Sequence, residues 1–116
     1  MNKLDKLCIR YLNDSIPNRL GGLAANLGHI TSFSKNDNHF QVVESILQES
    51  KWFIEWTSSD LAIEALAELV QLQILLAQWE IQSPKKWNDP NWRIELANQS
   101  REWSQRVLQM SGLLNL

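Results

Sequence analysis

The 116-residue chain has little cysteine, glycine, proline or histidine, with one, four, three and two residues respectively. Because Cys8 is alone, no disulfide can form within the chain, which is typical of proteins in a reducing compartment. The scarcity of glycine and proline disfavours many short strands joined by tight turns. No segment approaches the roughly 18–20 apolar residues of a membrane span, and the N-terminal residues lack the apolar core of a signal peptide. We therefore expect a cytoplasmic protein with no membrane association.

The chain also lacks an excess of positive charge, since its formal net charge is -2. A protein that binds phosphates normally shows a basic patch, so nucleic acid is an unfavourable partner. Between Glu44 and Glu80 there are seven acidic residues and one basic residue, Lys51, whereas the two ends of the chain are basic. Two interpretations follow. Either basic end helices pack beside acidic central ones, or an acidic surface binds a basic partner.

Apolar residues recur at spacings of three and four along the chain, which is the period of an amphipathic helix. This pattern predicts helices over about 3–13, 16–30, 38–57, 59–82 and 90–111. Asp89 followed by Pro90 is a strong start signal, and Gly112 is a natural C-cap. Thr57, Ser58 or Ser59 would cap the fourth helix, with Asp60 at its N-terminal dipole.

We therefore predict an all-α fold, an antiparallel bundle of four main helices plus a short N-terminal helix, in a single helical domain over residues 1–116. The fourth helix is apolar over most of its circumference, so we expect other helices to surround it. Gly21, Gly22 and Gly28 weaken the second helix but leave room for a neighbouring backbone. The apolar tail 113–116 is expected to fold back on the bundle or to meet a partner.

Six tryptophans lie between residues 52 and 103, and each one can bury roughly 150–250 Å². Trp79, Trp92 and Trp103 follow the apolar stripes of their helices and are predicted to be core anchors. Trp52, Trp56 and Trp87 fit those stripes less well. They either pack against the N-terminal helix or the C-terminal tail, or they form an exposed aromatic patch that binds a partner or a second copy of the chain.

His29 is a candidate for phosphotransfer, because histidine phosphotransfer modules are helical bundles that carry a histidine on a helix. Those modules usually place a lysine and a glycine shortly after the histidine, whereas Ile30 and Thr31 follow it here. Kinase dimerisation domains, which place an acidic residue beside the histidine, are also not matched. A phosphotransfer-like module centred on His29 is thus an alternative that lacks the usual neighbours.

The segment Leu23–Thr31 looks like the middle of a helix-turn-helix motif, with Ala24 and Gly28 at the spacing of its turn. The recognition helix should then carry an apolar anchor about six residues after the glycine, but that position is Ser34. A polar Asn/Asp segment follows in place of a basic helix. DNA binding is therefore the lesser alternative.

Residue patterns for catalysis or for cofactor binding are absent from the sequence. His29 and His39 are ten residues apart, Cys8 has no second cysteine, and no Glu-x-x-His pair occurs. The chain also has no Gly-rich phosphate loop and no Gly-x-Ser-x-Gly sequence. We expect no enzyme activity, no catalytic or cofactor-binding residues, no metal site and no small-molecule ligand.

The segment Glu49–Thr57, together with Leu23–Leu27 upstream, resembles a family of small all-helical cyanobacterial proteins. The resemblance covers about a third of the chain and includes no motif with chemistry. The resemblance implies that the protein lies in the cytoplasm of a photosynthetic bacterium. It implies no activity and no site residues. From the residues themselves we predict a non-enzymatic interaction or regulatory protein, with a protein partner or a homodimer held at Trp52, Trp56 and Trp87.

Overall fold

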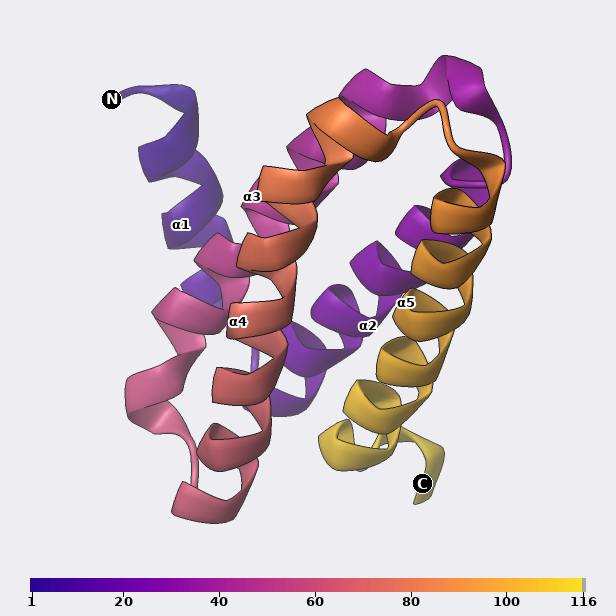
Figure 1. Cartoon of the computed structure of the whole chain (residues 1–116). Coiled ribbons are helices and arrows are strands. Elements are labelled where there is room, and N and C mark those ends of the chain that lie inside the picture. The colour runs from indigo at the N-terminus through magenta and orange to yellow at the C-terminus, as the bar shows by residue number, and fades with distance from the viewer. Residues whose placement is uncertain (116) are drawn as a thin grey trace.

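The computed structural model describes residues 1–115, which form an all-α fold (Figure 1). The helices are α1 (Lys3–Asn13), α2 (Ile16–Phe33), α3 (Phe40–Thr57), α4 (Ile63–Lys86) and α5 (Pro90–Ser111). Short 3₁₀ turns cover Asp37–His39, Ser58–Asp60 and Leu113–Asn115. The predicted all-α class with four main helices and a short N-terminal one is confirmed, and the prediction for Leu116 lies outside the described residues.

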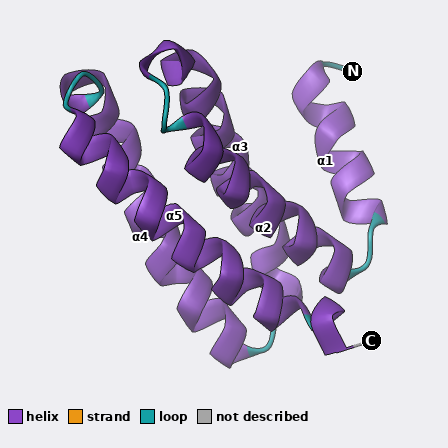
Figure 2. Cartoon of the chain, turned by 90° about the vertical axis from the view of Figure 1, so that its right-hand side faces the viewer, coloured by secondary structure: helices purple, strands orange, loops and turns teal. Residues whose placement is uncertain are grey.

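Figure 2 shows α2 and α3 lying between α1 on one side and α4 and α5 on the other. The helix with the most extensive packing is α2, which lies along both α5 and α3. Its buried residues are Leu20, Leu23, Ala24, Leu27 and Ile30. The centre of the fold is thus α2. The apolar pattern had predicted α4 at the centre, and that prediction is wrong.

The boundaries of α5 agree with the local signals in the sequence. The Asp89 side chain accepts a hydrogen bond from the Asn91 N–H at 2.9 Å, and Pro90 occupies the first helical position. At the other end Gly112 has a φ of 78°, a left-handed conformation that glycine adopts without steric cost. Ser15 caps α2 in the same manner as Asp89 caps α5, and Pro17 lies in the first turn of α2.

The predicted boundaries of α4 are wrong at both ends. Ser58–Asp60 forms a 3₁₀ turn, and the N-cap position is taken by Ala62, which offers no side-chain acceptor. The Asp60 carboxylate forms an ion pair with Arg19 at 2.8 Å and does not interact with the N-terminal dipole of α4 as predicted. At the C-terminal end the helix continues through Pro84 to Lys86. A proline in the last turn removes few helical hydrogen bonds. Pro84 has no N–H to donate to the carbonyl of Glu80, and the Ser83 hydroxyl donates to that carbonyl instead, at 3.5 Å.

The packing of α2 against α5 depends on small residues. The Ser104 hydroxyl donates to the carbonyl of Ala24 at 2.7 Å, and the hydroxyls of Thr31 and Ser100 are 2.7 Å apart. A Cβ placed on Gly28 would lie 3.7 Å from the Ser104 hydroxyl oxygen, so the two helices are in close contact at this level. The glycine at which a side chain would clash is Gly21, where a Cβ would lie 2.8 Å from the Leu113 side chain, so the neighbour there is a side chain and not the expected backbone.

The prediction that other helices surround α4 is wrong. Ile63 is 75% exposed and Ile81 is 69% exposed, although Leu69, Leu72 and Leu76 on the opposite side are buried. Hydrophobic periodicity shows which sides of a helix are apolar. It does not show whether another helix of the same chain covers each apolar side. The outer side of α4 therefore remains uncovered in the described part of the protein.

Among the described helices none is both long enough and apolar enough to cross a membrane.

Candidate interaction surface

Four aromatic side chains from α1 and α3 form one cluster, which we call the aromatic face: Tyr11, Trp52, Phe53 and Trp56. The rings of Tyr11 and Phe53 are stacked, with centroids 4.0 Å apart and an interplanar angle of 8°. Trp56 lies 6.0 Å from Tyr11 and 6.2 Å from Phe53 in tilted orientations. Trp52 stacks on Trp56 at 6.2 Å with an interplanar angle of 20°. The four rings form a continuous series that spans α1 and α3.

Burial decreases along this series from the core to the surface. Tyr11 and Phe53 are buried, whereas Trp56 and Trp52 are both partly exposed. Trp56 packs against the core cluster, and Trp52 stacks on it one helical turn earlier. Two adjacent indole rings therefore reach solvent, and the Trp56 ring rests on the buried pair of Tyr11 and Phe53.

Tyr11 fixes α1 against α3 through its hydroxyl as well as its ring. The hydroxyl donates to the carbonyl of Arg19 at 2.9 Å and accepts from the Thr57 hydroxyl at 3.3 Å. Burial raises the pKa of Tyr11 to about 12, and the hydrogen bond from Thr57 opposes that rise. The phenol is thus neutral at physiological pH and serves as a structural hydrogen-bonding group.

Arg19 holds the C-terminal end of α1 in place. Its guanidinium donates to the carbonyls of Leu12 and Asp14, both at 3.0 Å, and to the carboxylate of Asp60 at 2.8 Å. One planar side chain thus joins the end of α1 to the turn between α3 and α4. Together, Arg19 and Tyr11 determine where α1 lies against the aromatic face.

The structure brings Trp52 and Trp56 together but places Trp87 elsewhere. Trp87 is 5% exposed, and its indole N–H donates to the carbonyl of Asp37 at 2.7 Å. Its ring lies 5.5 Å from Phe40 and 6.4 Å from Trp92. Trp87 therefore ties the end of α4 to the start of α3, and we leave it out of the aromatic face.

The tryptophans predicted to be core anchors do pack into the bundle. Trp79 and Trp103 are buried, and Trp92 is partly buried with its indole N–H donating to Gln82 at 3.3 Å. The Arg106 guanidinium lies over the Trp103 ring at 3.8 Å from the centroid, in a cation–π contact.

One of the two interpretations placed Trp52 and Trp56 against the N-terminal helix, and Trp56 does pack against Tyr11 of α1. Sequence reasoning did not single out Tyr11 or Phe53 as the residues beneath the two partly exposed tryptophans. Tyr11 lies in the helix predicted over 3–13 and Phe53 in the helix predicted over 38–57, and nothing in the sequence pairs the two residues. The signal that could have joined them is the spacing of Phe53 and Trp56, which are neighbours on a helix surface. The position of α1 against them depends on Arg19 and Thr57, which no local pattern reveals.

The helix-turn-helix alternative is wrong, because α2 is unbroken from Ile16 to Phe33 and has no turn at Gly28. Ser34 is buried at the end of that helix, where its hydroxyl donates to the carbonyl of Ile30 at 2.6 Å. His29 is exposed on α2, and its ring lies 6.3 Å from that of Phe33.

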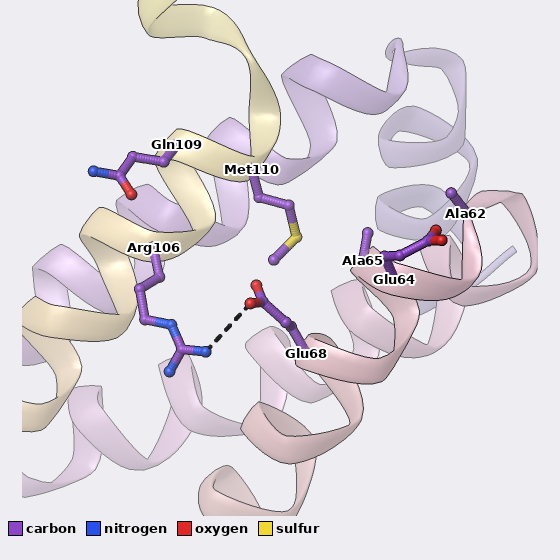
Figure 3. A pocket seen from close by; sticks show the side chains of 7 residues that line it. All are labelled: Ala62, Glu64, Ala65, Glu68, Arg106, Gln109 and Met110. Atoms are coloured by element: carbon purple, nitrogen blue, oxygen red, sulfur yellow. Dashed lines mark ion pairs between the residues drawn. The ribbon is translucent and has the colours of Figure 1, made fainter.

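A hollow of about 550 Å³ lies between the start of α4 and the end of α5 (Figure 3). Figure 3 shows the Glu68 carboxylate facing Arg106 across it, with an ion-pair distance of 3.5 Å, and the Met110 side chain pointing toward Glu68. The hollow is open to solvent, and Glu68 and Arg106 are each nearly half exposed. Within the described residues, no three His, Cys, Asp or Glu side chains are grouped closely enough to hold a metal ion.

Comparison with protein-family models, curated proteins and solved structures finds no match to this chain. The resemblance to a cyanobacterial family therefore stays a prediction.

Proposed function

We propose that this protein is a non-enzymatic helical interaction module of the cytoplasm, and that it binds a protein partner through the aromatic face. The observation that carries the proposal is the stacked, partly exposed pair Trp52 and Trp56, of which Trp56 rests on the buried pair Tyr11 and Phe53. Tryptophan is enriched at binding hot spots because it offers a large contact area with little conformational entropy to lose. The rigid support beneath the pair reduces that loss further.

The α3 side of the face is acidic and favours a basic partner there, whereas α1 on the other side carries exposed lysine and arginine side chains. Glu44 and Glu55 are exposed and share with Trp52 the side of α3 that faces away from its buried residues. Lys51, the one basic residue of this acidic segment, is engaged in an ion pair with Glu80 of α4. The partner that fits is an amphipathic segment with an apolar side for the indoles and Lys or Arg beside it.

A selection from a library of displayed helical peptides on the immobilised full chain tests this proposal. We expect the enriched peptides to combine an apolar stripe with basic residues. Replacing both indoles (Trp52→Ala with Trp56→Ala) should weaken their binding by about tenfold or more, since hot-spot tryptophans dominate such contacts. The circular dichroism of the variant should keep its helical signal because the buried ring pair remains.

Ile94→Ala is the matched control, because Ile94 is a large apolar residue of α5 that is 58% exposed outside the aromatic face. Its binding should equal that of the wild type. Peptides that bind the double variant as tightly as the wild type would contradict the proposal. So would a library that enriches only acidic sequences.

A further inference from the structure

A hollow of about 260 Å³ lies where the C-terminal end of α2 meets the first half of α5, and we call it the cationic hollow. Four larger hollows on the described surface each include at least one acidic side chain. The cationic hollow includes no acidic side chain. Its cations are Lys35 and Arg93, and its apolar side chains are Pro90, Ile94 and Ala97.

Arg93 is partly buried, and backbone carbonyls hold it in place. Its Nε donates to the carbonyl of Trp87 at 2.8 Å, and a terminal nitrogen donates to the carbonyl of Ser34 at 3.4 Å. The guanidinium carbon lies 5.9 Å from the centre of the Trp87 ring. Trp87 is itself anchored, because its indole N–H donates to the carbonyl of Asp37. The guanidinium is thus fixed at the hollow in advance, which reduces the entropy that binding an anion would cost.

The positive charge of the hollow has no counter-ion within residues 1–115. Neither Arg93 nor Lys35 belongs to the ion pairs described there. A guanidinium has five N–H donors, and the bonds to Trp87 and Ser34 use two of them, which leaves three. A partly buried charge is more stable beside a counter-ion, and a guanidinium can bind a carboxylate with two parallel hydrogen bonds. An anion with planar oxygens therefore complements this hollow.

The rest of the hollow favours an anion that carries an aliphatic group. Pro90, Ile94 and Ala97 lie on the same side of α5 as Arg93. Inorganic phosphate would leave these three side chains without an apolar contact, whereas a short aliphatic chain would cover them. The volume of 260 Å³ lies below the range of roughly 300–1,000 Å³ that is usual for drug-sized ligands, so the anion is small.

We propose that the cationic hollow binds a short aliphatic carboxylate, with Arg93 and Lys35 at the carboxylate and Ile94 at the chain. Such a group occurs in a free short-chain acid and at the C-terminus of a peptide that ends in an aliphatic residue. No sequence motif indicates the site, because its two cations come from segments far apart in the chain. The aromatic face lies on α1 and α3, so this inference does not depend on the proposed function.

Titration of the full chain with 3-methylbutanoate, at constant pH and ionic strength, tests this inference. The probe should shift the Trp87 indole N–H signal, assigned by Trp87→Phe, because Arg93 lies over that ring. We expect half-saturation on the order of millimolar concentrations, as is usual for so small a ligand. Acetate and inorganic phosphate should bind about fivefold more weakly or worse, because neither covers the aliphatic side chains. The uncharged 3-methylbutanol should bind about tenfold more weakly or worse.

Substitution of each cation tests its contribution. Arg93→Gln should weaken the binding of 3-methylbutanoate by about tenfold or more, because it removes a charge-assisted pair. Lys35→Gln should weaken it by about two- to fivefold, because an exposed ammonium contributes less. Lys6→Gln, at an exposed lysine of α1, is the matched control and should leave binding unchanged. Trp52→Ala with Trp56→Ala should also leave it unchanged, so a failure of this inference is distinguishable from a failure of the proposed function.

A short peptide that ends in leucine distinguishes the two sources of the carboxylate. If the peptide binds more tightly than 3-methylbutanoate and its C-terminal amide does not bind, the ligand is a peptide terminus. If the free acid binds at least as tightly as the peptide, the ligand is a small acid.

A Trp87 signal that does not move with 3-methylbutanoate up to about 100 mM overturns the inference. Equal binding of 3-methylbutanol overturns the role of the cations, and equal binding of phosphate overturns the aliphatic carboxylate. A Lys6→Gln variant that weakens binding as much as Lys35→Gln also overturns the site. If Arg93→Gln does not fold, Lys35→Gln and the alcohol decide the outcome by the same criteria.

Discussion

Tyr11 links the fold to the candidate site more directly than any other side chain. Its ring stacks on Phe53 and its hydroxyl bonds to Arg19 and Thr57, so one residue of α1 contacts both α2 and α3. Trp56 then rests against the Tyr11 ring. The partly exposed tryptophan pair therefore depends on a buried, neutral phenol.

The titration of Tyr11 gives a prediction that can be measured without labels, because it is the only tyrosine in the chain. Burial raises its pKa from the ordinary 10.0 to about 12. Between these values the unfolded chain releases a proton that the folded chain keeps. The contribution of Tyr11 to the free energy of unfolding should therefore be constant below about pH 10 and fall as the pH rises toward 12. Tyrosinate absorbance of the folded protein should show a midpoint near 12.

Tyr11→Phe is the control for this titration. It should be less stable at neutral pH because two hydrogen bonds are lost, and it should lack the alkaline fall that the phenol causes. A tyrosinate midpoint near 10 in the folded wild type would contradict the buried position of Tyr11.

At the scale of helices, the pair formed by α2 and α5 is the main support of the bundle. Small residues let the two helices approach closely, and the hydroxyls of Thr31, Ser100 and Ser104 satisfy each other and the backbone at the contact. Such contacts depend on the volume of the side chains more than on their polarity.

Substitutions at Gly28 test this packing. Gly28→Ala should raise the free energy of unfolding by about 0.5–1 kcal/mol, because alanine favours the helix and its Cβ would lie 3.7 Å from Ser104, an ordinary contact distance. Gly28→Leu should lower it by about 1–3 kcal/mol, because the larger side chain forces the helices apart. Urea denaturation followed by circular dichroism measures both. A loss of stability in Gly28→Ala would contradict the described spacing.

The ends of the helices show which features a sequence predicts well. The start of α5 at Asp89 and Pro90 and its end at Gly112 were predicted correctly, because caps act within a few residues of the chain. The start of α4 was not, because Asp60 is drawn into an ion pair with Arg19, which is distant in sequence. Local signals are reliable until a long-range contact competes with them.

At the scale of the whole molecule, the six tryptophans have different roles. Trp79, Trp87 and Trp103 are buried, whereas Trp52, Trp56 and Trp92 are each partly exposed. Trp92 donates its indole N–H within the bundle, and Trp52 and Trp56 form a stacked pair on α3. The sequence predicted that Trp52 and Trp56 lie one turn apart beside the inner face of their helix. It did not predict the burial of Trp87, because the partner of its indole N–H is the carbonyl of Asp37, fifty residues earlier. It also did not predict that one apolar side of α4, which includes Ile63 and Ile81, faces solvent.

The central claim is that Trp52 and Trp56 bind a partner while the other tryptophans hold the fold. Its most direct test is the indole N–H region of a nitrogen–proton correlation spectrum, recorded while a peptide selected on the full chain is added. The account predicts that the signals of Trp52 and Trp56, assigned by Trp52→Phe and Trp56→Phe, shift with the peptide while those of Trp79, Trp87 and Trp103 stay in place. Shifts confined to the buried tryptophans, with Trp52 and Trp56 unmoved, would contradict it.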